Sequence, residues 1–179
     1  MKKIIYIIGF ILLNFNVFAQ NDSIVIDSTG LNQIVFDSAA NQEILVGFCD
    51  KEGLRNFPEI TESFNKEYES YKAYIDFLNQ YRDSLLKFKI IIVMGTWCGD
   101  SRREVPRFYK IMDELNIPED NITLICVDRS KKAGNINLED YYVELVPTFI
   151  FMKGNIEKGR IIEAPSETLE NDIGQIISQ

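Results

Sequence analysis

The sequence predicts an α/β fold with a central mixed β-sheet flanked by helices. Residues 89–95 and 121–127 are continuous apolar runs rich in β-branched side chains, as expected for strands buried on both faces. Segments with apolar residues three and four positions apart, typical of amphipathic helices, precede and follow these runs. A strand pair and a last helix complete an alternation typical of one layered domain, and 179 residues favour a single domain.

The first 19 residues are predicted to be a signal peptide. They begin with two lysines, continue with an apolar run over residues 4–13, and end on Ala19, a small residue suited to signal-peptidase cleavage. A membrane anchor is the alternative, but the apolar run is short and followed by two asparagines. No cysteine follows the cleavage point, which argues against a lipid anchor. We expect a periplasmic or secreted protein with no stable membrane anchor after cleavage.

The composition excludes several classes of function. Without Lys2 and Lys3, the chain has 17 basic and 27 acidic side chains, a net charge of −10, which argues against nucleic acid as a partner. It has no histidine, so Ser-His and Cys-His catalytic pairs are excluded and a zinc site is not expected. We expect no cofactor. Three cysteines in an oxidising compartment suggest one free or intermolecularly paired thiol.

The folded domain is predicted to span residues 44–179, after a polar segment over residues 20–43. A faint ten-residue echo in that segment, IVIDSTGLNQ and IVFDSAANQE, is interpreted as two short edge strands or a coincidental linker. Residues 43–50 form a plausible first strand. The domain includes a helical N-terminal extension over about residues 54–88.

The extension carries one apolar helical face, which we interpret as two helices with a core-facing stripe rather than a ligand groove. Its members are Ile60, Phe64, Tyr68, Tyr71, Ile75, Leu78, Tyr81 and Leu85. After the strand at residues 89–95, a helix is expected over residues 100–116, kinked at Pro106.

The C-terminal third is expected to hold a polar loop, a strand pair and a helix. The loop follows the strand at residues 121–127, and a short helix or turn comes before residue 146. The turn KGN at residues 153–155 joins the two strands of a hairpin. Ser166 is expected to cap the last helix, with Thr168 in its first turn.

Cys98 is the candidate nucleophile. It directly follows a buried strand and stands at the first turn of a helix, where unpaired N–H groups and a partial positive charge favour a thiolate. Arg102 and Arg103 would add positive potential, while Asp100 and Glu104 oppose it. The alternative is a buried structural cysteine, which the polar strand-to-helix turn disfavours.

Two motifs carry a resemblance to a known family. The motif WCGDS starts at Trp97 after an apolar strand, and the motif VPTF starts at Val146 before the next-to-last strand. Together they resemble the thioredoxin family, especially exported bacterial thioredoxin-like proteins with an N-terminal extension. The resemblance covers residue 89 to the C-terminus, and begins at residue 43 if the first strand and the helices supply the leading β-α unit.

The resemblance implies roles for single residues. Cys98 matches the attacking cysteine of the family and Trp97 its flanking residue, and the rest of the active-site motif is formed by Gly99, Asp100, Ser101 and Arg102.

The second motif is implied to bind substrate. Pro147 matches the proline that is cis in the family and lies against the active-site sulfur. It orients Val146, whose backbone groups pair with an extended substrate segment in the family, and Thr148 follows it in the motif.

The sequence departs from the family at two positions. Ser101 replaces the second cysteine, so the motif is C-x-x-S, and no disulfide between positions 98 and 101 can form. Ile92 occupies the place where many thioredoxins keep a buried aspartate as proton acceptor. The usual dithiol reductase cycle is therefore not available.

A second thiol must then come from elsewhere. One hypothesis is a monothiol cycle, in which Cys98 attacks a substrate disulfide and the substrate's own second thiol, a small thiol or a membrane redox partner expels it. Another is that Cys49, or less plausibly the mid-strand Cys126, acts as resolving thiol.

We therefore expect a thiol-disulfide oxidoreductase or isomerase that acts on disulfide- or thiol-bearing proteins. A non-catalytic module that binds peptides or proteins, and a thiol oxidation sensor, remain alternatives.

Overall fold

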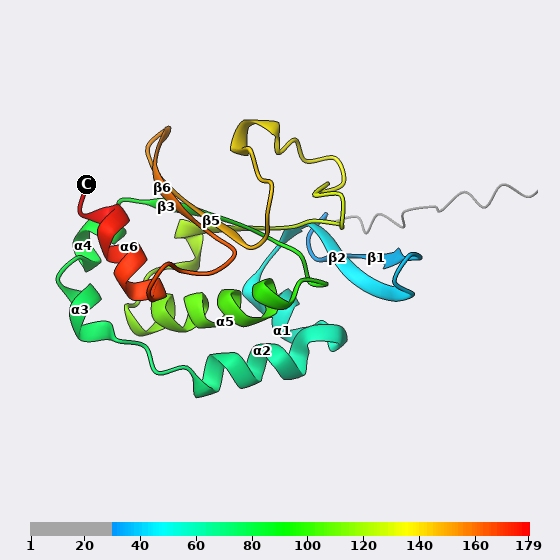
Figure 1. The fold of residues 1–179 in the computed structure, drawn as a ribbon, viewed down its shortest axis with the longest axis horizontal. Helices are drawn as coiled ribbons and strands as arrows, with labels where there is room; N and C mark the ends of the chain where they lie inside the picture. Colours follow the sequence, from blue (N-terminus) through cyan, green and yellow to red (C-terminus); the bar gives the residue numbers. More distant parts are fainter. Residues whose placement is uncertain (1–29) are drawn as a thin grey trace, which may run out of the picture.

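The protein is described by a computed structural model over residues 30–179 (Figure 1). The predicted signal peptide (1–19) and residues 20–29 of the polar segment lie outside the described residues. Within residues 30–179, no helix is both long and apolar enough to cross a bilayer.

A six-stranded sheet forms the centre of the fold, in the order β1-β2-β4-β3-β5-β6. The strands are β1 (Gln33–Asp37), β2 (Gln42–Cys49), β3 (Lys89–Met94), β4 (Ile122–Cys126), β5 (Thr148–Lys153) and β6 (Ile156–Ile162). Strands β3 and β4 are parallel and the other neighbouring pairs are antiparallel, so the predicted mixed sheet is confirmed.

The helices gather on one side of this sheet. They are α1 (Lys51–Asn56), α2 (Pro58–Ser70), α3 (Ile75–Asn79), α4 (Arg82–Leu85), α5 (Gly99–Glu114) and α6 (Leu169–Ile177), with short 3-10 turns η1 (Glu119–Asn121) and η2 (Glu139–Tyr141). Figure 1 shows α1, α2, α5 and α6 on one side of the sheet and the yellow segment before β5 on the other. That segment, residues 128–146, is called the β4–β5 segment below.

The prediction of two helices between residues 57 and 88 is wrong, because this stretch forms α2, α3 and α4. Helix α2 ends at Tyr71, whose backbone is extended. The hydroxyl of Tyr71 and the backbone N–H of Tyr74 both donate to the buried carboxylate of Glu170 on α6. These contacts direct the chain from the end of α2 towards α6, and a single long helix would lose them.

Two hydrophobic clusters lie on the two sides of the sheet, because alternate residues of a strand face opposite ways. The helix-side cluster joins α1–α6 to strand residues that include Ile92, Met94, Leu124 and Cys126. The loop-side cluster consists of Val93, Ile125, Val127, Ala133 and Val146, with Trp97 and Cys98 packed against it. The apolar stripe of the extension belongs to the helix-side cluster, as predicted for a core face.

Helix boundaries differ from the expectation at α6. Thr168 is its N-cap, and its side chain accepts from the backbone N–H of Asn171, so the prediction of Ser166 as cap is wrong. Ser166 instead binds the carboxylate of Asp172. Helix α5 runs unbroken through Pro106.

Candidate functional site

The turn between β3 and α5 positions Cys98 at a helix N-terminus. Cys98 is the N-cap residue of α5, with an extended backbone. Its N–H donates to the carbonyl of Gly95 (2.9 Å), and its own carbonyl accepts the first helical hydrogen bond, from Arg102 (3.0 Å). The half-buried side chain therefore leaves the chain where the N–H groups of the first turn are unpaired.

The loop before β5 supplies the other side of the site. The Val146–Pro147 peptide bond is cis, and both residues are buried. The Cys98 thiol donates to the carbonyl oxygen of Val146 at 3.1 Å. Residues 48 positions apart in the chain thus meet at the sulfur.

Ser101 faces away from solvent and supports the turn. It is 0% exposed, and its Oγ accepts from the backbone N–H of Gly95 at 3.2 Å. The hydroxyl thus fixes the chain just before Cys98. Sequence reasoning missed Gly95, although a glycine between a buried strand and a tryptophan is a usable signal: a Cβ at this position would lie 2.5 Å from the indole of Trp97.

Thr96 is a second residue that sequence reasoning missed. It is buried, and its Oγ accepts from the backbone N–H of Leu45 on β2 (3.2 Å). Its carbonyl accepts from the guanidinium of Arg102. The turn that carries Cys98 is therefore anchored both to strand β2 and to its own helix.

Trp97 is oriented by the β4–β5 segment and the strand end before it. Its indole N–H donates to the carbonyl of Val127 at 2.9 Å. The cations of Arg129 and Lys131 lie over the ring, 5.1 and 5.5 Å from its centre, at distances typical of cation–π interactions. The sequence marked residues 128–135 only as a polar loop, because a cation–π pair between distant segments leaves no local pattern.

The charges near Cys98 are largely paired. Arg103 donates to Asp100 (2.7 Å) and to Glu104 (2.6 Å), and its hydrogen bond to Glu104 is the main reason that the pKa of Arg103 is raised. Glu104 is 3% exposed and also lies 3.5 Å from Arg107. Arg102 and Arg103 are expected from the sequence to add positive potential near Cys98. Instead, the guanidinium of Arg102 binds a backbone carbonyl and that of Arg103 binds two carboxylates. Gly99 is exposed in the same turn.

Thr148 lies at the start of β5, behind the cis bond. It is 1% exposed, and its Oγ donates to the carbonyl of Leu145 at 2.7 Å. This bond fastens the turn that carries Val146, whereas the side chain of Leu145 itself is 45% exposed.

Cys49 and Cys126 lie on the other side of the sheet. Both belong to the helix-side cluster, whereas Cys98 packs against the loop-side cluster. All three cysteines are free thiols. The structure therefore brings Cys49 together with Cys126, and it does not bring Cys49 to Cys98.

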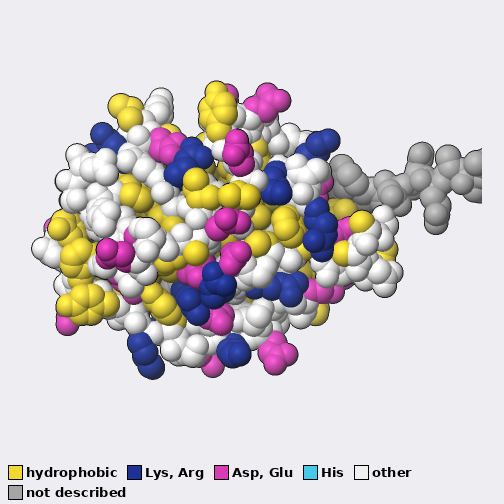
Figure 2. All heavy atoms as spheres, in the orientation of Figure 1, with side chains coloured by type: hydrophobic (Ala, Val, Ile, Leu, Met, Phe, Trp, Pro, Cys, Tyr) yellow, Lys and Arg dark blue, Asp and Glu magenta, His cyan; other side chains and the backbone are white. Residues whose placement is uncertain are grey.

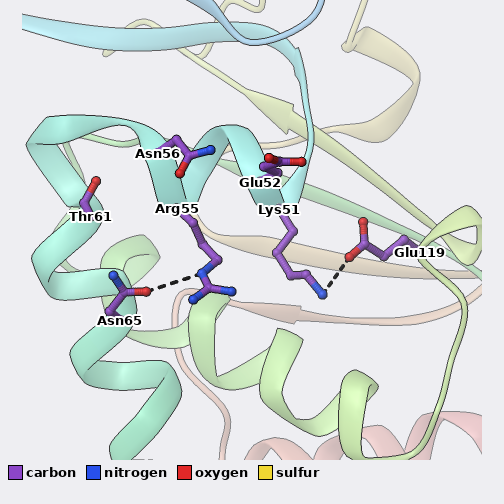
Figure 3. Close-up of a pocket in the computed structure, with 7 residues that line it drawn as sticks. All are labelled: Lys51, Glu52, Arg55, Asn56, Thr61, Asn65 and Glu119. Atoms are coloured by element: carbon purple, nitrogen blue, oxygen red, sulfur yellow. Dashed lines mark hydrogen bonds and ion pairs between the residues drawn. The ribbon is translucent and has the colours of Figure 1, made fainter.

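A pocket of about 460 Å³ between α1, α2 and η1 is separate from this site (Figure 3). Its cation Lys51 is bonded to Glu119 (2.6 Å) and to Asp113 (2.9 Å), and Arg55 donates to Asn65 (3.3 Å). Lys51 and Glu119 in this pocket are thus already paired within the chain. Among residues 30–179, no group of three or more His, Cys, Asp or Glu side chains is arranged to hold a metal ion.

The protein belongs to the thioredoxin family. The family model described as "Thioredoxin" matches residues 51–172, which includes both motifs and the helices α1–α4. An H-type thioredoxin of Oryza sativa subsp. indica is 31% identical over 87 residues. The match covers 49% of this chain and 66% of that relative's length.

Solved structures with a similar chain path are more distant. A Pseudomonas aeruginosa protein of unknown function is 13% identical with a TM-score of 0.49, covering 72% of this chain and 89% of its own. Thioredoxin O2 from Arabidopsis thaliana in the oxidized state is 20% identical with a TM-score of 0.36, covering 56% of this chain and 85% of its own.

Proposed function

We propose that this protein is an exported thiol-disulfide oxidoreductase or isomerase that works through one nucleophilic cysteine, Cys98. The observation that carries the proposal is the position of the Cys98 sulfur. It is half-buried at the N-terminus of α5 and 3.1 Å from the carbonyl of Val146, beside the cis bond to Pro147. Unpaired N–H groups of a helix N-terminus stabilise a thiolate, which is the attacking form.

The reaction needs no cofactor and balances with thiols and disulfides alone. The Cys98 thiolate attacks one sulfur of a substrate disulfide, the substrate S–S bond breaks, and one substrate thiolate leaves. A mixed disulfide between Cys98 and the substrate remains. A second thiolate then attacks this bond, forms a new disulfide and releases Cys98 as thiolate.

The second thiol is proposed to come from outside the chain. Position 101 offers only a hydroxyl, which is buried and bonded to the N–H of Gly95. Cys49 packs on the other side of the sheet. We therefore favour the substrate's own second thiol, which gives isomerisation, or a small thiol or redox partner, which gives net reduction.

Substrates are proposed to be proteins that present a disulfide in an extended segment. Such a segment can pair with backbone groups near Val146, in the manner of β-strand addition. Exposed apolar side chains at Leu145 and Tyr142 lie in the same part of the chain and offer contact area for its side chains.

Export is proposed from the signal-like N-terminus. Cleavage after Ala19 would leave a mature chain beginning at Gln20 in the periplasm or the medium. N-terminal sequencing of the mature protein from fractionated cells tests this, and an uncleaved chain in the cytoplasmic fraction would contradict it.

Trapping tests the chemistry. The protein is purified from its native compartment without reductant, and partners attached to Cys98 are identified by mass spectrometry after release with a thiol. The matched control is Cys98→Ser, which retains the fold and the loop of Val146 but cannot form a mixed disulfide. We expect partners on the wild-type protein and none on the variant.

A turnover assay distinguishes the proposed enzyme from a binding module and from an oxidation sensor. We expect wild-type protein to accelerate refolding of scrambled ribonuclease in a thiol buffer, and Cys98→Ser to be inactive. Equal behaviour of the two proteins, with Cys98 alkylated no faster than a free thiol at pH 7, would indicate a binding module instead. A stable sulfenic acid or small-thiol adduct on Cys98 without turnover would indicate an oxidation sensor.

A further inference from the structure

Two of the three cysteines lie on neighbouring strands, away from the proposed site. In the antiparallel ladder of β2 and β4, Gly47 is opposite Cys126 and Cys49 is opposite Leu124. Cys49 and Cys126 are therefore diagonal neighbours, two positions apart in register, on the same side of the sheet. They are 6% and 0% exposed.

The side chains of this pair have room to approach each other. The residue directly opposite Cys126 is a glycine, so no side chain separates Cys126 from the position of Cys49. Gly47 has a φ of +96°, a backbone conformation that favours glycine, and a Cβ built there would meet nothing within 4 Å. The Cys49 thiol leans back along its strand and donates to the carbonyl of Gly47, at 3.7 Å.

The two thiols interact in the reduced protein. A hydrogen bond with Cys49 is the main reason that the pKa of Cys126 is raised, and its complete burial adds to the effect. Both side chains are buried in the folded protein, which restricts the access of an external oxidant. The pair is therefore more accessible to an oxidant while the chain folds.

Backbone geometry permits a bond between them after a small adjustment. Diagonal neighbours in an antiparallel ladder have Cα atoms about 7–8 Å apart, and disulfides span about 4.4–6.8 Å. The β2–β4 ladder has only the three pairs from Gly47 to Cys49, at the end of β2. A bond across this diagonal therefore requires the strands to move together by about 1 Å. The movement falls at the end of β2, outside the five pairs that join β3 and β4.

We propose that Cys49 and Cys126 form a disulfide when the protein folds under oxidising conditions, which leaves Cys98 as the free thiol. The oxidant is a small-molecule or protein disulfide. Its S–S bond breaks, it takes up the two electrons and leaves as two thiols, and the two cysteines lose their protons as the new S–S bond forms. Of the three cysteines, two then form a structural disulfide and the third, Cys98, remains a free thiol.

The bond would tie the N-terminal hairpin to the parallel pair of strands. Its loop, from residue 49 to residue 126, contains α1–α5 and the active-site turn. A closed loop of this size restricts the unfolded chain, so the midpoint of thermal unfolding is expected to rise by on the order of 10 °C.

Tryptic peptide mapping tests the bond, because each cysteine lies on its own peptide. Cys49 is on the peptide that ends at Lys51, Cys98 on residues 90–102 and Cys126 on residues 111–129. The full mature chain is refolded from denaturant in a glutathione redox buffer, blocked with an alkylating agent and digested without reduction. We expect a linked pair of the first and third peptides, and alkylated Cys98.

Three outcomes would overturn the proposal: three alkylated cysteines after refolding in the redox buffer, a link between Cys49 and Cys98, or a link between Cys98 and Cys126. A link from Cys49 to Cys98 would instead identify Cys49 as a resolving thiol. Thermal unfolding gives an independent readout. Wild-type protein refolded with excess reductant should unfold at a lower temperature than protein refolded in the redox buffer.

Variants connect this shift to the pair. The reductant-dependent difference should vanish in Cys49→Ala and in Cys126→Ala, and it should persist in the control Cys98→Ser. If Cys49→Ala or Cys126→Ala fails to fold, the peptide map of the wild-type protein still shows whether the disulfide forms. The inference stands apart from the proposed function, because Cys98→Ser abolishes thiol exchange at the site and leaves the 49–126 link in place.

Discussion

A hydroxyl at position 101 gives Cys98 a different set of reactions from those of a dithiol site. Ser101 is buried against the N–H of Gly95, so it holds the turn and offers no second sulfur. The first turn of a helix nevertheless places the Cα atoms of positions i and i+3 about 5 Å apart, within the Cα–Cα span of a disulfide. Only the atom type at position 101 prevents an internal bond.

The variant Ser101→Cys should therefore convert the proposed monothiol site into a dithiol site. We expect its mixed disulfides to be released at least about tenfold faster than those of the wild type, because the resolving thiol is intramolecular. Stopped alkylation followed by non-reducing electrophoresis measures the lifetime. The control Ser101→Ala should keep the wild-type lifetime, and equal lifetimes for all three proteins would contradict the prediction.

Glu104 shows how a buried charge is maintained next to the site. Its carboxylate is 3% exposed, and it accepts from Arg103 at 2.6 Å while Arg107 lies 3.5 Å away. We expect Glu104→Gln to lower the free energy of unfolding by on the order of 3 kcal/mol, since it leaves two arginines without their shared anion.

Glu114 on the same helix provides the matched control for Glu104. It pairs with Lys110 at 3.1 Å, and its side chain is 37% exposed. Glu114→Gln should cost no more than about 0.5 kcal/mol, because solvent screens such a pair. Urea unfolding of both variants measures the difference, and equal losses would refute the role assigned to Glu104.

At the scale of elements, the docking of α2 on α5 depends on a tyrosine hydroxyl. Tyr68 donates to the carboxylate of Asp113 on α5, and its ring lies under the cations of Arg55 and Lys110. Desolvation, followed by the hydrogen bond to Asp113, raises the pKa of Tyr68 to about 12. The ordinary value is 10.0.

This shift predicts a loss of stability at alkaline pH. Because the pKa is higher in the folded protein, the stabilising contribution of Tyr68 is complete below about pH 10 and is lost as the pH rises through about 12. Thermal unfolding between pH 9 and 12 measures this decline. Tyr68→Phe should unfold more easily at pH 8 and lose less on the approach to pH 12, and a slope identical to the wild type would count against it.

The sequence predicts elements well where one periodic pattern decides them, and poorly where distant contacts do. The buried strands β3 and β4 and the helix that starts beside Cys98 follow from local runs of residues. The break between α2 and α3 depends on Glu170, a residue nearly one hundred positions away. Likewise, the motif in the sequence identifies Trp97 and Cys98 as site residues. The position of Arg129 and Lys131 over the Trp97 ring could not be predicted, because no local spacing in the sequence indicates it.

At the scale of the whole molecule, charges of both signs are interspersed on the face seen in Figure 2. The stability of the fold comes from the buried side chains of the helix-side cluster. Phe108 of α5 is fully buried and packs on Phe149 and Phe151 of β5, with ring centres 4.9 and 6.3 Å away. These contacts join α5, which begins beside Cys98, to the strand that follows the cis bond.

Removing this ring should weaken the entire fold. We expect Phe108→Ala to lower the free energy of unfolding by about 3–5 kcal/mol, since it leaves a cavity between α5 and β5. The control Phe108→Leu keeps much of the volume and should lose clearly less. Chemical unfolding followed by circular dichroism checks both, and a loss below about 1 kcal/mol for the alanine variant would contradict this view of the core.

The β4–β5 segment differs from the other walls of the site, because it crosses the sheet with only the short turn η2 as regular structure. A few apolar side chains, Ala133, Ile136, Leu138 and Val143, attach it to the loop-side cluster. The positions between them are mostly exposed, yet the segment supplies the cations over Trp97 and ends at Val146. Under the proposed function, a combinatorial library confined to these exposed positions is expected to change substrate preference while the buried attachment points keep the fold intact.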